Sequence, residues 1–254
     1  MNELQFYNIL LSVFGGMAIC VFVVLFFVSA PYGRFSRSGW GPRIDNRWGW
    51  FLMEVPASIL FFFYFFISDR STELVPVLFL IIWQSHYIYR VFGYPITLQR
   101  KRSMPLMVIL FAVVFNVFNT YIQARWIFTL SPDKAYTIDW LKDPRFIVGV
   151  LLFYGGFAVN RHSDRILRVL RKSGKTEYSI PQKGLFHFVS CPNYLGEIIQ
   201  WLGWALALWS ISGLMFAFWT VANLLPRARS HHQWYVDTFP DYPRNRKALI
   251  PHII

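Results

Sequence analysis

A polar segment between Asn160 and Glu197 carries residue types whose spacing suits the binding of an anion. Its first candidates follow one another at steps of four, four and three residues, so on a helix they would share one face. They are Asn160, Asp164, Arg168 and Arg171. Asn193 and Glu197 repeat the four-residue step after a loop. Because guanidinium groups bind phosphate through paired hydrogen bonds, the segment predicts an anion-binding surface, with a solvated basic loop and a plain N-cap at Asn193 as the alternative.

An acidic residue, Glu54, lies inside the apolar run WGWFLMEVPASILFFFYFF. Ionisable groups are costly inside a membrane, so such a residue is by default a functional candidate. Apolar surroundings favour the neutral acid, which could donate a proton or a hydrogen bond. Tyr87 lies in the next apolar run, roughly 11 Å from the same membrane face against roughly 9 Å for Glu54, at 1.5 Å per helical residue. The pair therefore predicts a proton-donating site within the membrane.

Both of these residues also have structural explanations. Glu54 could make an interhelical polar contact with His86 or Ser58, and Tyr87 could be a packed or interfacial aromatic residue. Arg90, three residues after Tyr87, is interpreted as an orientation charge or a lipid-headgroup contact.

The C-terminal region repeats the same helical spacing. Three residues at steps of four would share one face of a helix: Arg227, His231 and Tyr235. This face could extend the anion-binding surface, or its basic residues could contact lipid headgroups. A metal site is not expected, because the adjacent His231 and His232 would point to different faces and no carboxylate stands at a ligand step from both.

The composition indicates that membrane-spanning helices position these residues. Of the 254 residues, 55% are hydrophobic and 20% aromatic, more than in ordinary soluble domains. The net charge of +12 comes from short Lys and Arg clusters between apolar blocks, so nucleic acid is not expected as a partner.

Cys20 and Cys191 have no disulfide, redox or zinc spacing. Glu3 stands where a signal peptide would be positive, so the first apolar run is expected to be a retained span.

Six apolar blocks are long enough to cross a hydrocarbon core of about 30 Å. They cover residues 6–30, 49–68, 74–94, 105–128, 144–160 and 194–226. The last block is too long for one span and is interrupted by Ser210, Ser212 and Gly213, so we predict two helices there and seven spans in all. Basic loops alternate strictly with balanced or uncharged ones, which predicts the N-terminus outside and the C-terminus in the cytosol. The predicted fold is an all-α integral membrane protein, with residues 1–254 in a single domain.

No Gly-rich dinucleotide fingerprint follows a predicted strand, so helices and loops at the membrane surface would have to hold any nucleotide. Two further classes of function stay open beside a reductase. A methyltransferase using S-adenosylmethionine would need neither the buried Glu54 nor so many arginines. A non-enzymatic lipid-binding or transport protein could use the buried acid to carry a proton.

Several motifs give the chain a resemblance to a known family. The segments NRHSDRILRVLRKSG, YSIPQKGLF, NYLGEIIQW and YPRNRKALIP resemble the C-terminal signature of the steroid 5α-reductases. The likeness extends to APYGRF, MEVP, HYIYR and QRKRSMP in the N-terminal half and so spans nearly the whole chain, with the type 2 branch as the expected nearest likeness.

The resemblance implies a seven-helix membrane enzyme that uses NADPH to reduce the 4,5 double bond of a 3-oxo-4-ene steroid. Residues 1–105 would supply mainly substrate-binding and catalytic helices, and residues 144–254 mainly the cofactor site. Glu54 and Tyr87 would be catalytic, binding the 3-keto oxygen. The cofactor residues would be Arg102, Asn160, Asp164, Arg168, Arg171, Tyr178, Asn193, Glu197, Arg227, His231 and Tyr235. The substrate-binding residues would be Tyr32, Met53, Glu54, Tyr87 and Trp201.

Two departures from the family pattern bear on substrate choice. Met53 stands where relatives have Gln, which removes a polar group beside Glu54, and Gln99 stands where the family has Asn. The C-terminal half alone also resembles sterol reductases and isoprenylcysteine carboxyl methyltransferases, so reduction of another unsaturated lipid stays open. We expect a monomer in contact with a steroid-like substrate and membrane lipids, in the endoplasmic reticulum of a eukaryote or the inner membrane of a bacterium, with its cofactor site facing the cytosol.

Overall fold

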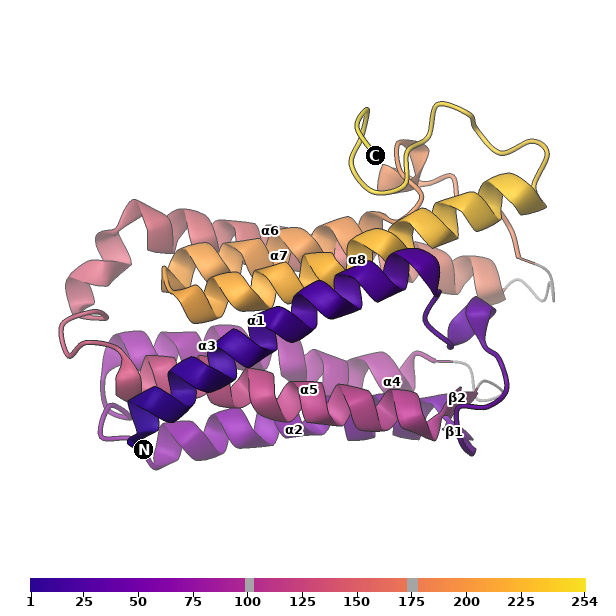
Figure 1. Ribbon diagram of the computed structural model, residues 1–254. Coiled ribbons are helices and arrows are strands. Elements are labelled where there is room, and N and C mark those ends of the chain that lie inside the picture. Colours follow the sequence, from indigo (N-terminus) through magenta and orange to yellow (C-terminus); the bar gives the residue numbers. More distant parts are fainter. Residues whose placement is uncertain (99–102, 173–177) are drawn as a thin grey trace. The chain divides into compact units, whose positions relative to one another are not determined.

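The computed structural model describes residues 1–98, 103–172 and 178–254, and of residues 171 and 172 the backbone alone. Long helices form nearly all of it (Figure 1). The α-helices are α1 (Glu3–Phe27), α2 (Asn46–Phe66), α3 (Leu74–Ile88), α4 (Tyr94–Ile96), α5 (Leu106–Arg125), α6 (Pro144–Lys172), α7 (Pro192–Leu208) and α8 (Ile211–Thr238). The shorter elements are η1 (Gly33–Phe35), η2 (Tyr89–Gly93), η3 (Trp126–Leu130), η4 (Ile138–Lys142), η5 (Gly184–His187), β1 (Arg43–Asp45) and β2 (Ser103–Pro105). The expected all-α class is thus confirmed, with one short antiparallel pairing of β1 and β2.

Four of the helices are long and apolar enough to cross a membrane. They cover Glu3–Phe27, Asn46–Phe66, Leu74–Ile96 and Leu106–Leu130, and they match the first four predicted spans. The fifth predicted span is part of α6, which continues as a helix to Lys172. The polar residues that follow residue 160 therefore lie on a helix, as their spacing predicts.

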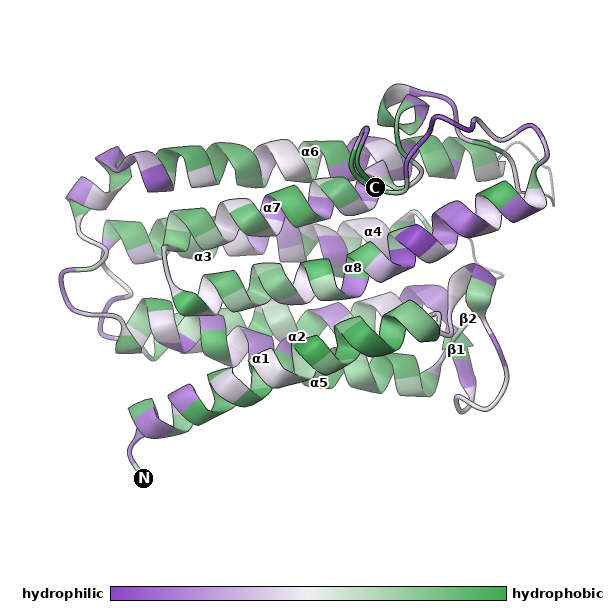
Figure 2. Ribbon diagram, turned by 45° about the horizontal axis from the view of Figure 1, so that its top comes forward, coloured by the Kyte–Doolittle hydropathy of each residue, from purple (hydrophilic) through white to green (hydrophobic). Residues whose placement is uncertain are grey.

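The last apolar block is divided where its small polar residues predict a break. Helix α7 ends at Leu208, and Trp209 adopts a left-handed conformation with φ 46°. Ser210 then caps α8, because its hydroxyl accepts a hydrogen bond from the backbone N–H of Gly213 at 3.1 Å. Figure 2 shows that α8 is largely hydrophobic in its first half and hydrophilic towards its end.

The chain divides into two compact units, of which the first comprises Met1–Phe14 and Ala30–Asp143. In this unit α2 and α3 are joined by polar and aromatic contacts. The indole N–H of Trp83 donates to the carbonyl of Ala57 at 3.0 Å. Ser58 donates to the Gln84 side chain at 2.7 Å, and Gln84 donates back to the Ser58 carbonyl at 2.9 Å. These contacts fix an antiparallel register between the two helices.

The second unit comprises Gly15–Ser29 and Pro144–Ile254. Its helices α6 and α7 approach so closely that a Cβ on Gly156 would lie 2.4 Å from the carbonyl oxygen of Gly196. A Cβ on Gly196 would in turn lie 2.5 Å from the backbone nitrogen of Asn160. Glycines at these crossing points allow the two backbones to touch. This contact brings the polar end of α6 against the first turns of α7.

Candidate active site

Glu54 is buried in the first unit, with 8% of its surface exposed. The guanidinium of Arg90 donates to Glu54 Oε1 from Nε at 3.2 Å and from Nη2 at 3.0 Å. Asn116 on α5 donates to the Met53 carbonyl at 2.6 Å, and its Nδ2 lies 3.5 Å from Glu54 Oε2. Glu54 thus makes a polar contact with Arg90, and Ser58 pairs with Gln84. A contact of Glu54 with His86 stays a prediction.

Tyr87 lies at the level of Glu54 along the two antiparallel helices. Gln84, three residues before Tyr87, pairs with Ser58, and Arg90, three residues after it, pairs with Glu54. The equal depth inferred for Glu54 and Tyr87 agrees with this register. Tyr87 is 3% exposed and its ring stacks on Trp83 at a centroid distance of 4.6 Å.

Two further substrate candidates belong to the same unit. The Met53 side chain is buried in an apolar cluster with Met104 and Ile109. Tyr32 is half-buried just before the 3-10 turn η1. Their roles toward a substrate stay predictions.

The second unit joins the polar faces of α6 and α7 that the sequence predicts. The Asn160 amide donates to the Asn193 carbonyl at 3.0 Å and to Glu197 Oε2 at 3.3 Å. The Asn193 amide donates to Asp164 Oδ1 at 3.2 Å. Two amides and two carboxylates therefore form one hydrogen-bonded cluster, although one pair lies on α6 and the other more than 25 residues later on α7.

A second group joins α7 to α8. Arg227 Nη2 donates to the Tyr194 hydroxyl at 3.0 Å, and its guanidinium lies 5.1 Å from the centre of that ring. His231 Nε2 lies 3.2 Å from the same hydroxyl. The predicted residues Arg227 and His231 thus meet at Tyr194, which our sequence reasoning missed although it follows Asn193 directly in the NYLGE motif.

Other candidate residues have different surroundings. Tyr235 is buried and stacks on Tyr242 of the C-terminal tail at 5.3 Å, and Tyr178 packs edge-on against Trp234 at 5.1 Å. Trp201 is 2% exposed among aromatic residues, with Phe216 at 4.1 Å. Arg168 is half-buried on α6. Arg102, Gln99 and the side chain of Arg171 lie outside the described residues.

The polar residues of the second unit suit a dinucleotide phosphate. Half-buried carboxylates such as Asp164 and Glu197 can accept hydrogen bonds from ribose hydroxyls or a carboxamide. Arg227 can bind phosphate oxygens, because Tyr194 holds its guanidinium from one side. The chemistry of the donor and acceptor groups therefore fits a nicotinamide cofactor.

The C-terminal tail closes over the start of α7. The backbone N–H groups of Ser190 and Cys191 donate to the carbonyls of Lys247 at 2.8 Å and Ala248 at 3.1 Å. Burial, together with the positive charges of Lys247 and Arg246, lowers the pKa of His232, which lies beyond the apolar part of α8. Burial also raises the pKa of Tyr242.

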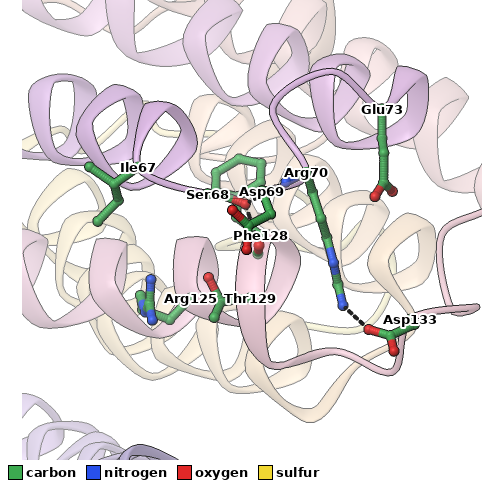
Figure 3. Close-up of a pocket in the computed structure, with 9 residues that line it drawn as sticks. All are labelled: Ile67, Ser68, Asp69, Arg70, Glu73, Arg125, Phe128, Thr129 and Asp133. Carbon is green, nitrogen blue, oxygen red and sulfur yellow. Dashed lines mark hydrogen bonds and ion pairs between the residues drawn. The ribbon is translucent and has the colours of Figure 1, made fainter.

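A cavity of about 400 Å³ lies elsewhere in the first unit, between the α2–α3 turn and the end of α5 (Figure 3). Its lining includes Arg70 and Arg125, and Arg70 forms an ion pair with Asp133 at 3.0 Å. No candidate catalytic or cofactor residue lines this cavity. It is therefore not the site that the sequence predicts.

Comparison with known proteins identifies the class of protein to which this fold and these residues belong. A family model described as 3-oxo-5-alpha-steroid 4-dehydrogenase matches residues 102–254. A 3-oxo-5-alpha-steroid 4-dehydrogenase 1 of Rattus norvegicus is 39% identical over 100% of this chain and 98% of its own length. The steroid 5-alpha-reductase DET2 of Gossypium hirsutum is 43% identical over 93% of both chains. The Homo sapiens 3-oxo-5-alpha-steroid 4-dehydrogenase 1 is 40% identical over 89% of this chain and 86% of its own.

The chain therefore belongs to the steroid 5α-reductase family, whose members are oxidoreductases of steroid metabolism. The family expected from the sequence motifs is confirmed. Since the relatives named above are type 1 and plant proteins, the expected likeness to the type 2 branch stays a prediction.

Proposed function

We propose that this protein uses NADPH to reduce the 4,5 double bond of 3-oxo-4-ene steroids. Family membership along the whole chain supports a reduction of this kind. The observation that carries the proposal is a buried carboxyl group, Glu54, whose two oxygens have different partners. A carboxyl group in this setting suits hydrogen bonding to a substrate carbonyl.

The chain's own residues would act on the 3-keto oxygen. Arg90 donates twice to Glu54 Oε1, whereas Oε2 has a longer contact of 3.5 Å with the Asn116 amide. Oε2 is therefore the oxygen that would carry a proton and donate it to the carbonyl. The Tyr87 hydroxyl would donate a second hydrogen bond. Together they would draw electron density away from C5 and stabilise the negative charge that develops on the oxygen. NADPH, when bound, would supply the hydride that C5 accepts. C4 would then take up a proton, so that the enol or enolate returns to the 3-ketone with the 4,5 bond saturated.

The second unit would hold this cofactor. Asn160, Asp164, Asn193 and Glu197 would bind its ribose and carboxamide groups, and Arg227 with His231 would bind phosphate. Arg102, Arg168 and Arg171 would add positive charge for the 2′-phosphate and pyrophosphate. Tyr178, Tyr235 and Trp201 are assigned to cofactor or substrate contacts by family resemblance alone.

The proposed setting is a membrane with the cofactor side in the cytosol. Seven spans, an outside N-terminus and a cytosolic tail follow from the alternation of basic and neutral loops. The partners would be a steroid-like lipid and the surrounding membrane lipids, and the protein would act as a monomer. The membrane would be the endoplasmic reticulum in a eukaryote and the inner membrane in a bacterium.

We expect Glu54→Gln and Tyr87→Phe each to reduce turnover at least about 100-fold, because each removes a group that stabilises charge in the transition state. Neither change should alter the rise in melting temperature that NADPH causes, since neither residue is assigned to the cofactor. Asp139→Asn is the matched control, because Asp139 is an exposed acid paired only with Lys142 among the ion pairs of the described chain. Wild-type turnover in both variants would contradict the proposal.

Reduction of another unsaturated lipid is the second candidate. The apolar surroundings of Met53 favour it, because the polar group expected beside Glu54 in a steroid reductase is replaced there by a buried thioether. A melting-temperature rise with S-adenosylmethionine instead of NADPH would point to methyl transfer.

A further inference from the structure

We propose that Arg90 is the positioning residue of Glu54, and that the π-helical element η2 delivers it. The inference rests on the proposed role of Glu54 as the proton donor. It assigns a function to a residue that hydropathy alone marks as an orientation charge.

Arg90 binds one oxygen of Glu54, while the other oxygen lies 3.5 Å from the Asn116 amide. Both of its donating nitrogens, Nε and Nη2, bind the same atom, Glu54 Oε1, at 3.2 and 3.0 Å. Asn116 supports the same turn of α2 by donating to the Met53 carbonyl at 2.6 Å. The Glu54 carboxyl is therefore contacted from η2 through Arg90 and from α5 through Asn116.

Two aromatic rings hold the guanidinium in turn. Its central carbon lies 4.3 Å from the centre of the Trp50 ring and 5.2 Å from that of Tyr94. These two rings contact each other edge-on at 4.7 Å. A planar guanidinium suits this setting, because it can stack on rings while it donates in its own plane. A lysine at position 90 would keep the charge but lose the two parallel donors.

The local helix geometry explains how Arg90 reaches this position. Residues Tyr89–Gly93 form a π-helical turn between α3 and α4, and such turns are frequent at functional sites. Gly93 ends this turn with the Tyr89 ring packed against it, because a Cβ at position 93 would lie 2.5 Å from Cδ2 of Tyr89 and the ring would have to shift. The turn thus places Arg90, and Tyr94 at the start of α4, beside Glu54 and Trp50.

The arrangement has a chemical consequence for the proposed proton donation. As the O–H bond at Glu54 Oε2 breaks and a bond from that proton to the substrate oxygen forms, Glu54 becomes a carboxylate. A buried carboxylate without a partner is strongly destabilised. Arg90 already pairs with Oε1, so the negative charge left on Glu54 is compensated without any rearrangement. Arg90 therefore acts on the reaction through Glu54.

The test compares Arg90→Ala, Arg90→Lys and Arg47→Ala in the full-length protein. Arg47 is the matched control, because its Nε and Nη2 also bind a single oxygen, the Leu98 carbonyl, at 3.1 and 2.8 Å. We expect Arg90→Ala to lower kcat about 100-fold with little change in KM for the enone. Added guanidinium ion should restore part of that kcat, and it should have no such effect on Arg47→Ala. A purely structural role would not produce this rescue.

Two outcomes would overturn the inference while the proposed function stands. The first is wild-type kcat in Arg90→Ala or Arg90→Lys while Glu54→Gln is inactive. The second is an Arg90→Ala protein that binds NADPH and has low kcat, but gains nothing from guanidinium. If Arg90→Ala does not fold, Arg90→Lys decides by its kcat alone. Wild-type activity in Glu54→Gln would instead refute the proposed function.

Discussion

At the scale of single residues, Ser190 connects the tail to the end of α8. Its hydroxyl lies 2.7 Å from His232 Nδ1, 2.6 Å from the Tyr242 hydroxyl and 3.1 Å from the Lys247 carbonyl. Arg246, 3% exposed, donates to the Pro181 carbonyl at 3.0 Å. A neutral His232 fits this site better than a charged one, because burial and the positive charges of Lys247 and Arg246 lower its pKa.

This site predicts a dependence of stability on pH. The folded protein lowers the pKa of His232, so below the unfolded value of about 6.5 the unfolded chain binds a proton that the folded chain does not. Stability should therefore fall as pH falls through about 6.5 and level off below the folded pKa. Melting temperatures measured from about pH 8 down to about pH 5, a range that brackets the ordinary histidine pKa, would show this decline. His232→Gln should flatten the curve, whereas the exposed His187→Gln serves as control, and an unchanged slope in His232→Gln would contradict the account.

The same scale shows what the sequence can predict about a site. Glu54 is recognisable because a lone acid in an apolar run is costly, and the four-residue steps indicate the faces that carry Asn160, Asp164 and Asn193. Arg90 is not recognisable, because a basic residue near the end of a span usually sets orientation and nothing in the local pattern indicates its partner. Asn116 could have been found as an amide within an apolar helix, where polar groups often make interhelical contacts.

At the scale of elements, the close contact of α6 and α7 sets the register of the residues that we propose bind the cofactor. A Cβ on Gly149 would meet the Ala207 backbone nitrogen at 2.4 Å, and one on Gly203 would meet that of Phe153 at 2.5 Å. The antiparallel register that these glycines permit continues to Asn160 and Gly196. The cluster of amides and carboxylates therefore depends on glycines that lie several turns away from it.

This register predicts a sharp difference between neighbouring glycines. Gly156→Ala should destabilise the protein by about 1–3 kcal/mol, because its Cβ would strike backbone atoms of α7 that cannot move aside. It should also weaken NADPH binding through the shifted register. Gly155→Ala is the control, since no atom lies within 4 Å of its Cβ and the gain in helix propensity is up to about 1 kcal/mol. Equal melting temperatures for the two variants would be evidence against the packing.

Hydropathy predicts most of the elements and misses their special turns. The four most apolar helices begin and end within a few residues of the predicted blocks, and the break at Trp209 and Ser210 follows from small polar residues. Hydropathy does not predict where α6 ends, because the helix continues beyond its apolar part through polar turns to Lys172. The π-helical turns η2 and η3 are not predicted either, since nothing in the apolar pattern distinguishes them from the α-helix around them.

At the scale of the whole molecule, the chemistry is divided between the two units. The first unit carries the buried carboxyl and its arginine, and the second carries the polar cluster suited to a nicotinamide cofactor. The match to family members over almost their entire length agrees with both parts belonging to one enzyme. We expect substrate choice to depend on apolar side chains such as Met53, which packs against Met104 and Ile109.

The most direct test of the central claim is analysis of the product. Purified protein would be supplied with NADPH and a panel of 3-oxo-4-ene steroids, and the products would be identified by mass spectrometry and NMR. We expect a product whose 4,5 bond is saturated and whose 3-keto group is retained, formed in step with NADPH consumption and absent with Glu54→Gln. The account would be contradicted if the protein bound NADPH yet left every enone steroid of the panel unchanged.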